Sequence, residues 1–289
     1  MWSVLEKWCL QGLERMSTPA QQTRIATARG HLHVRCWAGA AGGETRSPIV
    51  LLHDSLGCTA LWRDFPDALA RLTGHPVISY DRLGFGLSDA HPGVLGVDFV
   101  ATEAQDSFGA LLDALAIDRF MVFGHSVGGG MAVSIAAAYG MRCQAVITES
   151  AQSFVEPLTL DGIRAARDSF AAPGQMQRLE KYHPGKAQWV LDAWVNTWLS
   201  PEFRGWNLDA ALARLRSPLL AFQGANDEFG SARQPQRIAD LAAAPVELVL
   251  LPGCGHVPHR ESTAQVLERV QHFVAQARLQ ADSARSSAG

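Results

Sequence analysis

Short apolar runs alternate with longer segments of helical periodicity along this chain, and this alternation restricts the fold more than any other feature. Pro48–His53 (PIVLLH) is apolar without alternation, as a strand buried on both faces requires. Similar runs follow at Pro76–Asp81, Phe120–Phe123, Ala145–Thr148, Pro218–Phe222 and Val246–Leu251. Strands separated by helices in this way predict a mainly parallel sheet with helices on both faces.

Two more strands are predicted at the start of the chain, so the sheet has eight. They are Arg24–Ala28 and Leu32–Trp37, joined by a turn at residues 29–31. Helices are predicted at Leu61–Leu72, Phe99–Ala116, Ser126–Tyr139, Pro235–Ala243 and Thr263–Leu279.

The alternation is interrupted once, between residues 150 and 207, where prolines and glycines separate helical pieces. An insertion of this size predicts a cap over the carboxyl edge of the sheet. We therefore expect an α/β core over 22–150 and 208–280, a helical cap over 151–207, an N-terminal amphipathic helix or arm over 1–21 and a flexible tail over 281–289.

Composition and charge exclude several kinds of protein. Lysine and arginine total 25 against 28 aspartates and glutamates, so the net charge of −3 leaves no basic excess for nucleic acid. No apolar run approaches the roughly 20 residues that span a bilayer. The five scattered cysteines contain no C-x-x-C pair, which favours a reducing, cytoplasmic location. The N-terminal helix is a candidate interface for a homodimer.

A glycine-flanked serine follows one of the predicted strands. Ser126 lies in Gly124-His125-Ser126-Val127-Gly128, between an apolar strand and the start of a helix. A serine hydroxyl is a weak nucleophile unless it is exposed, oriented and deprotonated by a neighbouring base. A sharp strand-to-helix turn exposes it, and such a turn requires residues without bulk two positions before and after. Ser126 is therefore the candidate nucleophile.

The candidate base and acid follow later strands. His256 lies in a glycine-rich loop after the last strand, at the edge where an α/β sheet builds its site. His259 is the alternative base. Asp227, just after Pro218–Phe222, is the candidate acid that orients the imidazole. Glu149 and Glu228 are the alternative acids.

Two backbone amides are the candidate oxyanion hole. The Val127 amide follows the nucleophile at a helix N-terminus, where N–H groups point outward. The Ser55 amide lies in the loop after Pro48–His53.

With these residues in view, the sequence resembles the α/β-hydrolase superfamily, in its capped serine-hydrolase branch. The resemblance covers essentially residues 22–277. It rests on five segments in order: Leu51–His53 with its loop, Asp81–Asp89, Gly124–Gly128, Gly224–Asp227 and Gly255–His259. Of these, Asp81–Asp89 is similar to the family's D-x-R-G-x-G-x-S segment, with the arginine shifted by one position. The chain order serine, acid, histidine also matches. The resemblance implies an eight-stranded α/β-hydrolase sheet with a helical cap.

One position departs from the family pattern. Asp54 stands where the family usually has glycine, after the loop histidine. An aspartate can adopt left-handed backbone conformations at some cost. Its carboxylate would oppose a developing oxyanion unless it turned away or paired, and Arg63 is the partner that we expect.

Aromatic residues dominate one part of the predicted cap. Trp189, Trp194, Trp198 and Trp206 lie within 18 positions. They either seal the cap to the core or line an apolar substrate pocket, with Trp194 and Trp198 as the candidate substrate-binding residues. Basic residues of the cap offer a grip for an anionic substrate tail, although most surface arginines bind nothing: Arg164, Arg167, Arg178 and Lys181.

These observations predict a carboxylic ester hydrolase (EC 3.1.1) that cleaves a small to medium apolar ester or lactone through an acyl-enzyme. The alternative enzyme is a carbon–carbon bond hydrolase of a diketone-like ring-cleavage product, and the non-enzyme alternative is a small-molecule receptor on the same fold. The sequence has no dinucleotide fingerprint, P-loop lysine or H-E-x-x-H motif, so we expect no cofactor and no metal.

Overall fold

The computed structural model describes residues 20–40 and 46–286. Eight strands form one sheet in the order β1-β2-β4-β3-β5-β6-β7-β8. Strand β2 is antiparallel to both neighbours, and every other pair is parallel. The strands are β1 (Gln21–Thr27), β2 (Gly30–Trp37), β3 (Ile49–Leu52), β4 (Val77–Tyr80), β5 (Phe120–His125), β6 (Cys143–Glu149), β7 (Leu219–Gly224) and β8 (Val246–Leu251). The predicted eight-stranded, mainly parallel sheet is confirmed.

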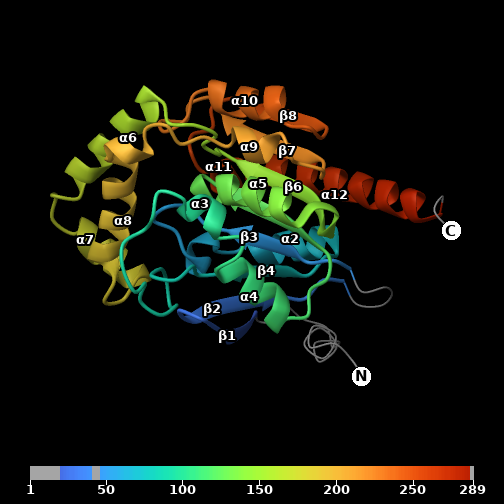
Figure 1. The fold of residues 1–289 in the computed structure, drawn as a ribbon, viewed down its shortest axis with the longest axis horizontal. Coiled ribbons are helices and arrows are strands. Elements are labelled where there is room, and N and C mark those ends of the chain that lie inside the picture. The colour runs from blue at the N-terminus through green and yellow to red at the C-terminus, as the bar shows by residue number, and fades with distance from the viewer. Residues whose placement is uncertain (1–19, 41–45, 287–289) are drawn as a thin grey trace.

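Two layers of helices cover the sheet (Figure 1). Strand β3 shows why its sequence does not alternate. Val50 and Leu52 contribute to the core on one face, whereas Ile49 and Leu51 contribute to the core on the other. The helices of the first face are α3 (Phe99–Thr102), α4 (Ser107–Ala114), α5 (Val127–Tyr139), α9 (Asp209–Leu212) and α10 (Arg233–Leu241). Those of the second are α2 (Phe65–Thr73) and α12 (Thr263–Ser286).

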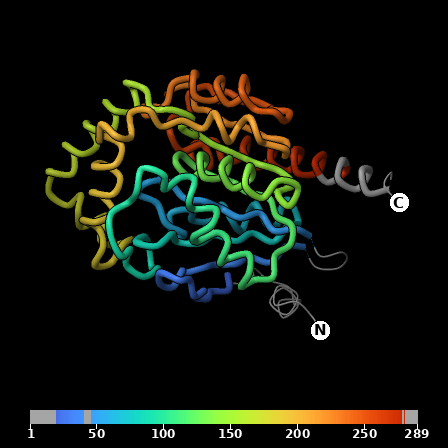
Figure 2. The backbone as a smooth tube through the Cα atoms, in the orientation of Figure 1, coloured from blue at the N-terminus to red at the C-terminus, as the bar shows by residue number. Residues whose placement is uncertain are grey.

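The segment between β6 and β7 contains three longer helices, α6 (Pro157–Ser169), α7 (Gln175–Tyr182) and α8 (Ala187–Leu199). Figure 2 shows this segment, coloured from yellow-green to yellow-orange, at one end of the molecule beyond the sheet. Shorter helical turns complete the fold: η1 (Thr59–Trp62), η2 (Gly140–Arg142), η3 (Pro201–Phe203) and α11 (Pro258–Glu261). The division into core and cap stays a prediction about domains, and the N-terminal helix expected within 1–21 falls almost entirely outside the described residues.

Two helix predictions are wrong in detail. The helix expected over 99–116 is broken between α3 and α4, where Glu103 is buried and accepts a 2.5 Å hydrogen bond from the Tyr80 hydroxyl. The last helix continues to Ser286, into the segment that we assigned to the tail. Within 20–40 and 46–286, the structure contains no helix that is both long and apolar enough to cross a membrane.

The turn between β5 and α5 depends on two glycines. A Cβ on Gly124 would lie 2.0 Å from the carbonyl oxygen of Gly128, and a Cβ on Gly128 would lie 2.2 Å from that of Leu52. Both contacts are with backbone, which cannot rotate away as a side chain does. The two glycines therefore let α5 start directly against β5 and β3.

We expect Gly128→Ala to lower the free energy of unfolding by about 3 kcal/mol or more, because overpacking against backbone forces the strand and helix apart. Urea denaturation measures this change. Gly205→Ala is the matched control, since no atom lies within 4 Å of its added Cβ. Equal stability of the two variants would contradict the close-packed turn.

Candidate active site

Ser126, Asp227 and His256 lie together at the carboxyl edge of the sheet. Ser126 follows β5, Asp227 follows β7 and His256 follows β8. The Ser126 Oγ lies 3.1 Å from His256 Nε2, and His256 Nδ1 lies 2.8 Å from Asp227 Oδ1. Because the carboxylate accepts a hydrogen bond from Nδ1–H, the neutral imidazole carries its lone pair on Nε2 and can accept the serine proton there.

The backbone of Ser126 is held in a left-handed conformation. Its φ of 57° and ψ of −122° occur at the residue that joins β5 to α5. Side chains rarely tolerate a positive φ, and such strain is concentrated at functional sites. The Ser126 Oγ also lies 3.2 Å from the amide oxygen of Gln152, so its single proton has two acceptors. Our sequence analysis missed Gln152, whose position after β6 was the available signal.

The Asp227 carboxylate is buried but well supplied with donors. Its Oδ1 accepts the backbone N–H groups of Phe229 and Gly230 at 2.8 and 3.1 Å, and its Oδ2 accepts from Gln223 Nε2 at 2.8 Å. Burial alone would raise the pKa of Asp227, but the hydrogen bonds and the neighbouring imidazole outweigh it and lower the pKa. Asp227 therefore stays ionised beside His256.

The electrostatic environment favours the charged form of His256. Burial acts to lower its pKa, but the hydrogen bond and charge of Asp227, together with the charges of Asp54 and Glu228, raise it above the ordinary value. Glu228, which the sequence offered as a possible acid, therefore influences His256 by charge. The carboxylate bonded to the imidazole is that of Asp227.

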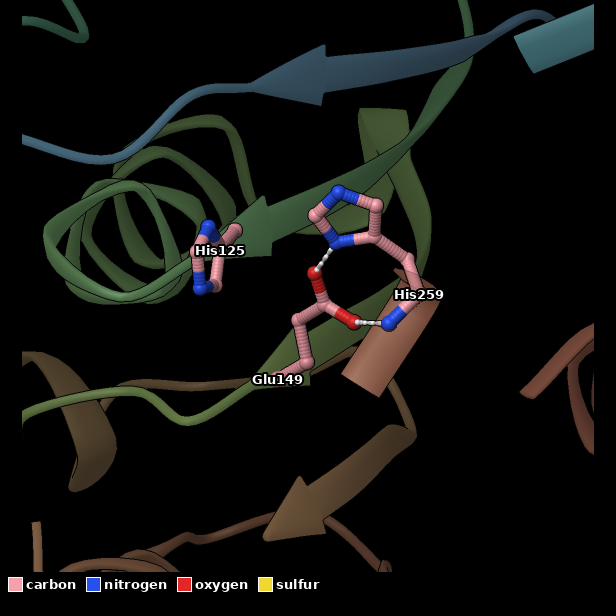
Figure 3. Close-up of side chains that lie close together, drawn as sticks. All are labelled: His125, Glu149 and His259. Carbon is pink, nitrogen blue, oxygen red and sulfur yellow. Dashed lines mark hydrogen bonds and ion pairs between the residues drawn. The ribbon is translucent and has the colours of Figure 1, made fainter. Parts of the chain in front are cut away.

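Glu149 and His259, which the sequence offered as a possible acid and a possible base, pair with each other behind the site (Figure 3). Glu149 accepts a short hydrogen bond from His259 Nδ1 through Oε1, and its Oε2 accepts the His259 backbone N–H at 2.9 Å. Next to them, the buried His125 contacts the His256 carbonyl oxygen through Nε2 at 2.8 Å. Burial lowers the pKa of His125, so its neutral form donates this hydrogen bond.

Glu149, His259 and His125 also form the one group of side chains, among those described, that lie close enough to share a metal ion. Both carboxylate oxygens of Glu149 already accept from His259, and His125 already donates to the His256 loop. These hydrogen bonds account for the cluster without an ion. Its observed contacts support the loop that carries His256.

The loop after β3, which carries Ser55, is fixed by the segment after β4. Asp81 Oδ1 accepts the Thr59 backbone N–H at 2.6 Å, and its Oδ2 accepts that of Leu87 at 2.8 Å. The buried Arg82 guanidinium donates to the Asp54 carbonyl oxygen at 2.9 Å. The family-like motif therefore holds the candidate oxyanion loop, and the oxyanion role of the Ser55 and Val127 amides stays a prediction.

Asp54 causes no left-handed strain. The described non-glycine residues with positive φ are Arg63, Ala116, Ser126 and Ser150. The expectation that Arg63 pairs with Asp54 is wrong. Among the described residues no arginine lies within ion-pair distance of the Asp54 carboxylate, and its Oδ2 lies 3.6 Å from Nδ1 of the neutral His125. Room for the Asp54 side chain comes from Gly57, where a Cβ would lie 2.0 Å from Asp54 Oδ1.

A cavity of about 210 Å³ opens beside Ser126. Its wall includes Ser55 and the rings of Trp194, Trp198 and Phe229. Helices of the insertion thus meet the strand-end loops here. Trp198 also packs on Phe203 and Trp206 within the core. The sequence predicts two alternative roles for the tryptophans, packing the insertion against the core or lining a cavity. The structure shows both, because Trp198 does each.

Comparison with known proteins supports the fold assignment. A family model described as the alpha/beta hydrolase fold matches residues 47–208. The 2-hydroxy-6-oxo-2,4-heptadienoate hydrolase of Pseudomonas putida is 25% identical over 253 residues, covering 79% of this chain and 89% of that protein. Human 1-acylglycerol-3-phosphate O-acyltransferase ABHD5 is 30% identical over 114 residues, but the match spans only 39% of this chain and 32% of that protein.

Solved structures show the same architecture. The enol-lactonase of Burkholderia xenovorans LB400 superposes with a TM-score of 0.69 at 19% identity, covering 88% of this chain and all of that one. At this level of identity the likeness establishes the fold alone.

The raised pKa of His256 predicts the pH dependence of catalysis. A base must be neutral to accept the serine proton, so a raised pKa moves the ascending limb of kcat/KM to higher pH. We expect its midpoint above the ordinary histidine value of about 6.5. The measurement is kcat/KM for a neutral ester between about pH 5 and 9. A midpoint well below the ordinary histidine value would contradict the assignment.

The buried Glu149–His259 pair predicts a large stability effect. Removing one partner of a buried pair costs about 3–5 kcal/mol because the other is left uncompensated, so Glu149→Ala should lower the free energy of unfolding by that amount. Glu247→Ala is the control. Its carboxylate pairs with Arg269 at the surface, with 39% and 50% of the two side chains exposed, and we expect a loss below about 1 kcal/mol. Equal losses in urea denaturation would refute the role of the buried pair.

Proposed function

Because the chain belongs to the α/β-hydrolase fold family, we propose that it is a serine hydrolase that cleaves a small carboxylic ester or lactone through an acyl-enzyme. The observation that carries this proposal is the continuous hydrogen-bonded chain from Ser126 through His256 to Asp227, placed at a cavity of about 210 Å³. Nucleophile, base and orienting acid are each within direct reach of the next.

In the proposed first step, Ser126 Oγ forms a bond to the carbonyl carbon while its proton moves to His256 Nε2. The carbonyl π electrons move to oxygen, and the Ser55 and Val127 amides donate hydrogen bonds to the resulting oxyanion. One such donor typically contributes about 2.7–4 kcal/mol of transition-state stabilisation. The ionised Asp227 stabilises the imidazolium that forms.

In the second step, the bond from the acyl carbon to the leaving alkoxide oxygen breaks, and His256 returns its proton to that oxygen. Water then attacks the acyl-enzyme by the same route in reverse, with His256 again accepting a proton. The carboxylic acid leaves and Ser126 recovers its hydroxyl. In a lactone, acid and alcohol are parts of one product.

A second candidate is hydrolysis of a carbon–carbon bond on the same three residues. The observation in its favour is the Pseudomonas putida relative, whose name states such a substrate and whose match extends over 89% of its length. Parallel turnover of simple esters and of a dienoate diketone separates the two candidates. A receptor on this fold would react with a fluorophosphonate but turn over neither substrate.

The wider setting of the protein is also part of the proposal. We infer a cytoplasmic location from the cysteine usage. Residues 1–21 remain our candidate for a homodimer interface. The enzyme itself needs a small ester-like substrate, without nucleic acid, metal or cofactor.

Replacing Ser126 tests the proposal directly. We expect Ser126→Ala to abolish the burst of p-nitrophenol from a p-nitrophenyl ester and to lower kcat by about 10⁶-fold, because the variant lacks the hydroxyl that lies within bonding distance of His256 Nε2. Ser150→Ala is the control, since its buried hydroxyl has no hydrogen-bond partner among the described residues. An undiminished burst in Ser126→Ala would overturn the assignment, as would a similar loss in both variants.

A further inference from the structure

Charged side chains that line the cavity carry one sign. Asp54 and Glu228 contribute to its wall together with His256, and no lysine or arginine among the described residues does. The two carboxylates lie near enough to the imidazole to raise the pKa of His256. The negative electrostatic potential at His256 therefore comes from Asp54 and Glu228 as well as from Asp227.

The Asp54 carboxylate is only partly compensated. Within the described part of the chain, its buried Oδ1 has no hydrogen-bond partner, and its Oδ2 lies 3.6 Å from His125 Nδ1, too far for a hydrogen bond. The nearby Arg82 guanidinium donates to the backbone carbonyl of Asp54. Because this carboxylate belongs to the cavity wall and lacks a cationic partner, its charge would attract a cation bound in the cavity.

Glu228 lies at the exposed rim. Among the residues that the structure describes, no lysine or arginine lies within ion-pair distance of its carboxylate. The cap arginines that could have balanced it are engaged elsewhere, Arg164 with Asp161 and Arg167 with Asp168. Neither lines the cavity, so the anionic substrate tail considered from the sequence has no cationic partner there within 20–40 and 46–286.

Aromatic rings complete the wall. Trp194 and Trp198 from α8 and Phe229 from the loop after β7 line the cavity beside the carboxylates, and the rings of Trp194 and Phe229 lie 6.0 Å apart. The negative faces of aromatic rings attract cations, and tryptophan does so most strongly. Carboxylates and aromatic rings without a lysine or arginine among the described wall residues form chemical surroundings that suit an ammonium group.

We propose that the substrate is a small ester bearing an ammonium group, which the Asp54 and Glu228 carboxylates and the aromatic wall select over neutral and anionic esters. This inference rests on the proposed serine hydrolase. The cavity volume of about 210 Å³ limits the substrate to a small one. The bound positive charge would also offset the opposition of Asp54 to the oxyanion.

The test compares a cationic ester with a neutral ester of the same shape and with an anionic ester. The probes are the butyrate esters of choline and of 3,3-dimethylbutanol, whose bulky ends have the same form, and the monobutyl ester of succinate as the anion. At low ionic strength, and at a pH high enough for His256 to be neutral, we expect kcat/KM for the choline ester to exceed that of its neutral counterpart at least tenfold. Salt should reduce this ratio, because it screens the attraction.

Variants of Asp54 and Glu228 test whether these carboxylates cause the preference for the choline ester. We expect Glu228→Gln to reduce the choline-to-neutral ratio at least threefold and Asp54→Asn to reduce it further, through KM for the choline ester. Using the ratio removes any general effect on turnover. Glu202→Gln is the matched control, because this exposed acid of η3 does not line the cavity and should leave the ratio unchanged.

Several results would overturn the inference. They are a ratio at or below one, a fastest reaction with the succinate ester, and an equal response of Glu228→Gln and Glu202→Gln. Failure of the proposed hydrolase would look different, since no ester would then turn over. Calorimetric binding of the choline and neutral esters to Ser126→Ala still decides the inference in that case, and equal affinities would refute it.

Discussion

The buried hydrogen bond between His256 and Asp227 is the interaction on which the site depends. It fixes the imidazole so that Nε2 faces Ser126, and it keeps a positive charge tolerable where burial alone would forbid it. The bond exists because the parallel strands β5, β7 and β8 all end at the same edge of the sheet. Residues separated by 130 positions, such as Ser126 and His256, thereby come within bonding distance.

A layer of polar residues behind this bond holds the loops in place. Glu149 ends β6 and receives both hydrogen bonds from His259, while His125 reaches the carbonyl of His256. These buried groups are costly unless each is paired, so the packing and the hydrogen bonds must be satisfied together. The aromatic rings that pack around them and exclude water are those of Trp62, Phe65 and Phe123. The position of the Ser126 region thus depends in part on residues that do not line the cavity.

The electrostatics of the site contain a conflict. In the proposed mechanism, the carboxylates around His256 stabilise the imidazolium but oppose the negative charge that develops on the carbonyl oxygen. Asp54 is the extreme case, because it stands in the loop that should supply an oxyanion donor. Its backbone carbonyl is tied to Arg82 and its side chain is accommodated by Gly57. Asp54 thus keeps a backbone conformation without positive φ, and we propose that the substrate balances its charge.

Local patterns determined much of this molecule. The apolar runs identified the parallel strands, because strands buried on both faces consist mainly of apolar residues. The spacing of Gly124 and Gly128 identified the turn at Ser126. Sequence order also favoured Asp227 and His256 over their neighbours. The break in the helix over 99–116 was not predicted; Glu103, which lies at the break, is hydrogen-bonded to Tyr80, a residue distant in the sequence.

Only the tertiary structure decided how the polar groups pair. It joined Glu149 to His259 and placed Gln152 beside Ser126. It left the Asp54 carboxylate near His125 without the expected Arg63 partner, and it gathered carboxylates and aromatic rings around one cavity. The physical reason is the difference in sequence separation over which the two kinds of interaction act. Periodicity and turn chemistry act within a few residues and can be read along the chain, whereas hydrogen bonds and charges depend on distances that exist only after strands far apart in sequence have packed together.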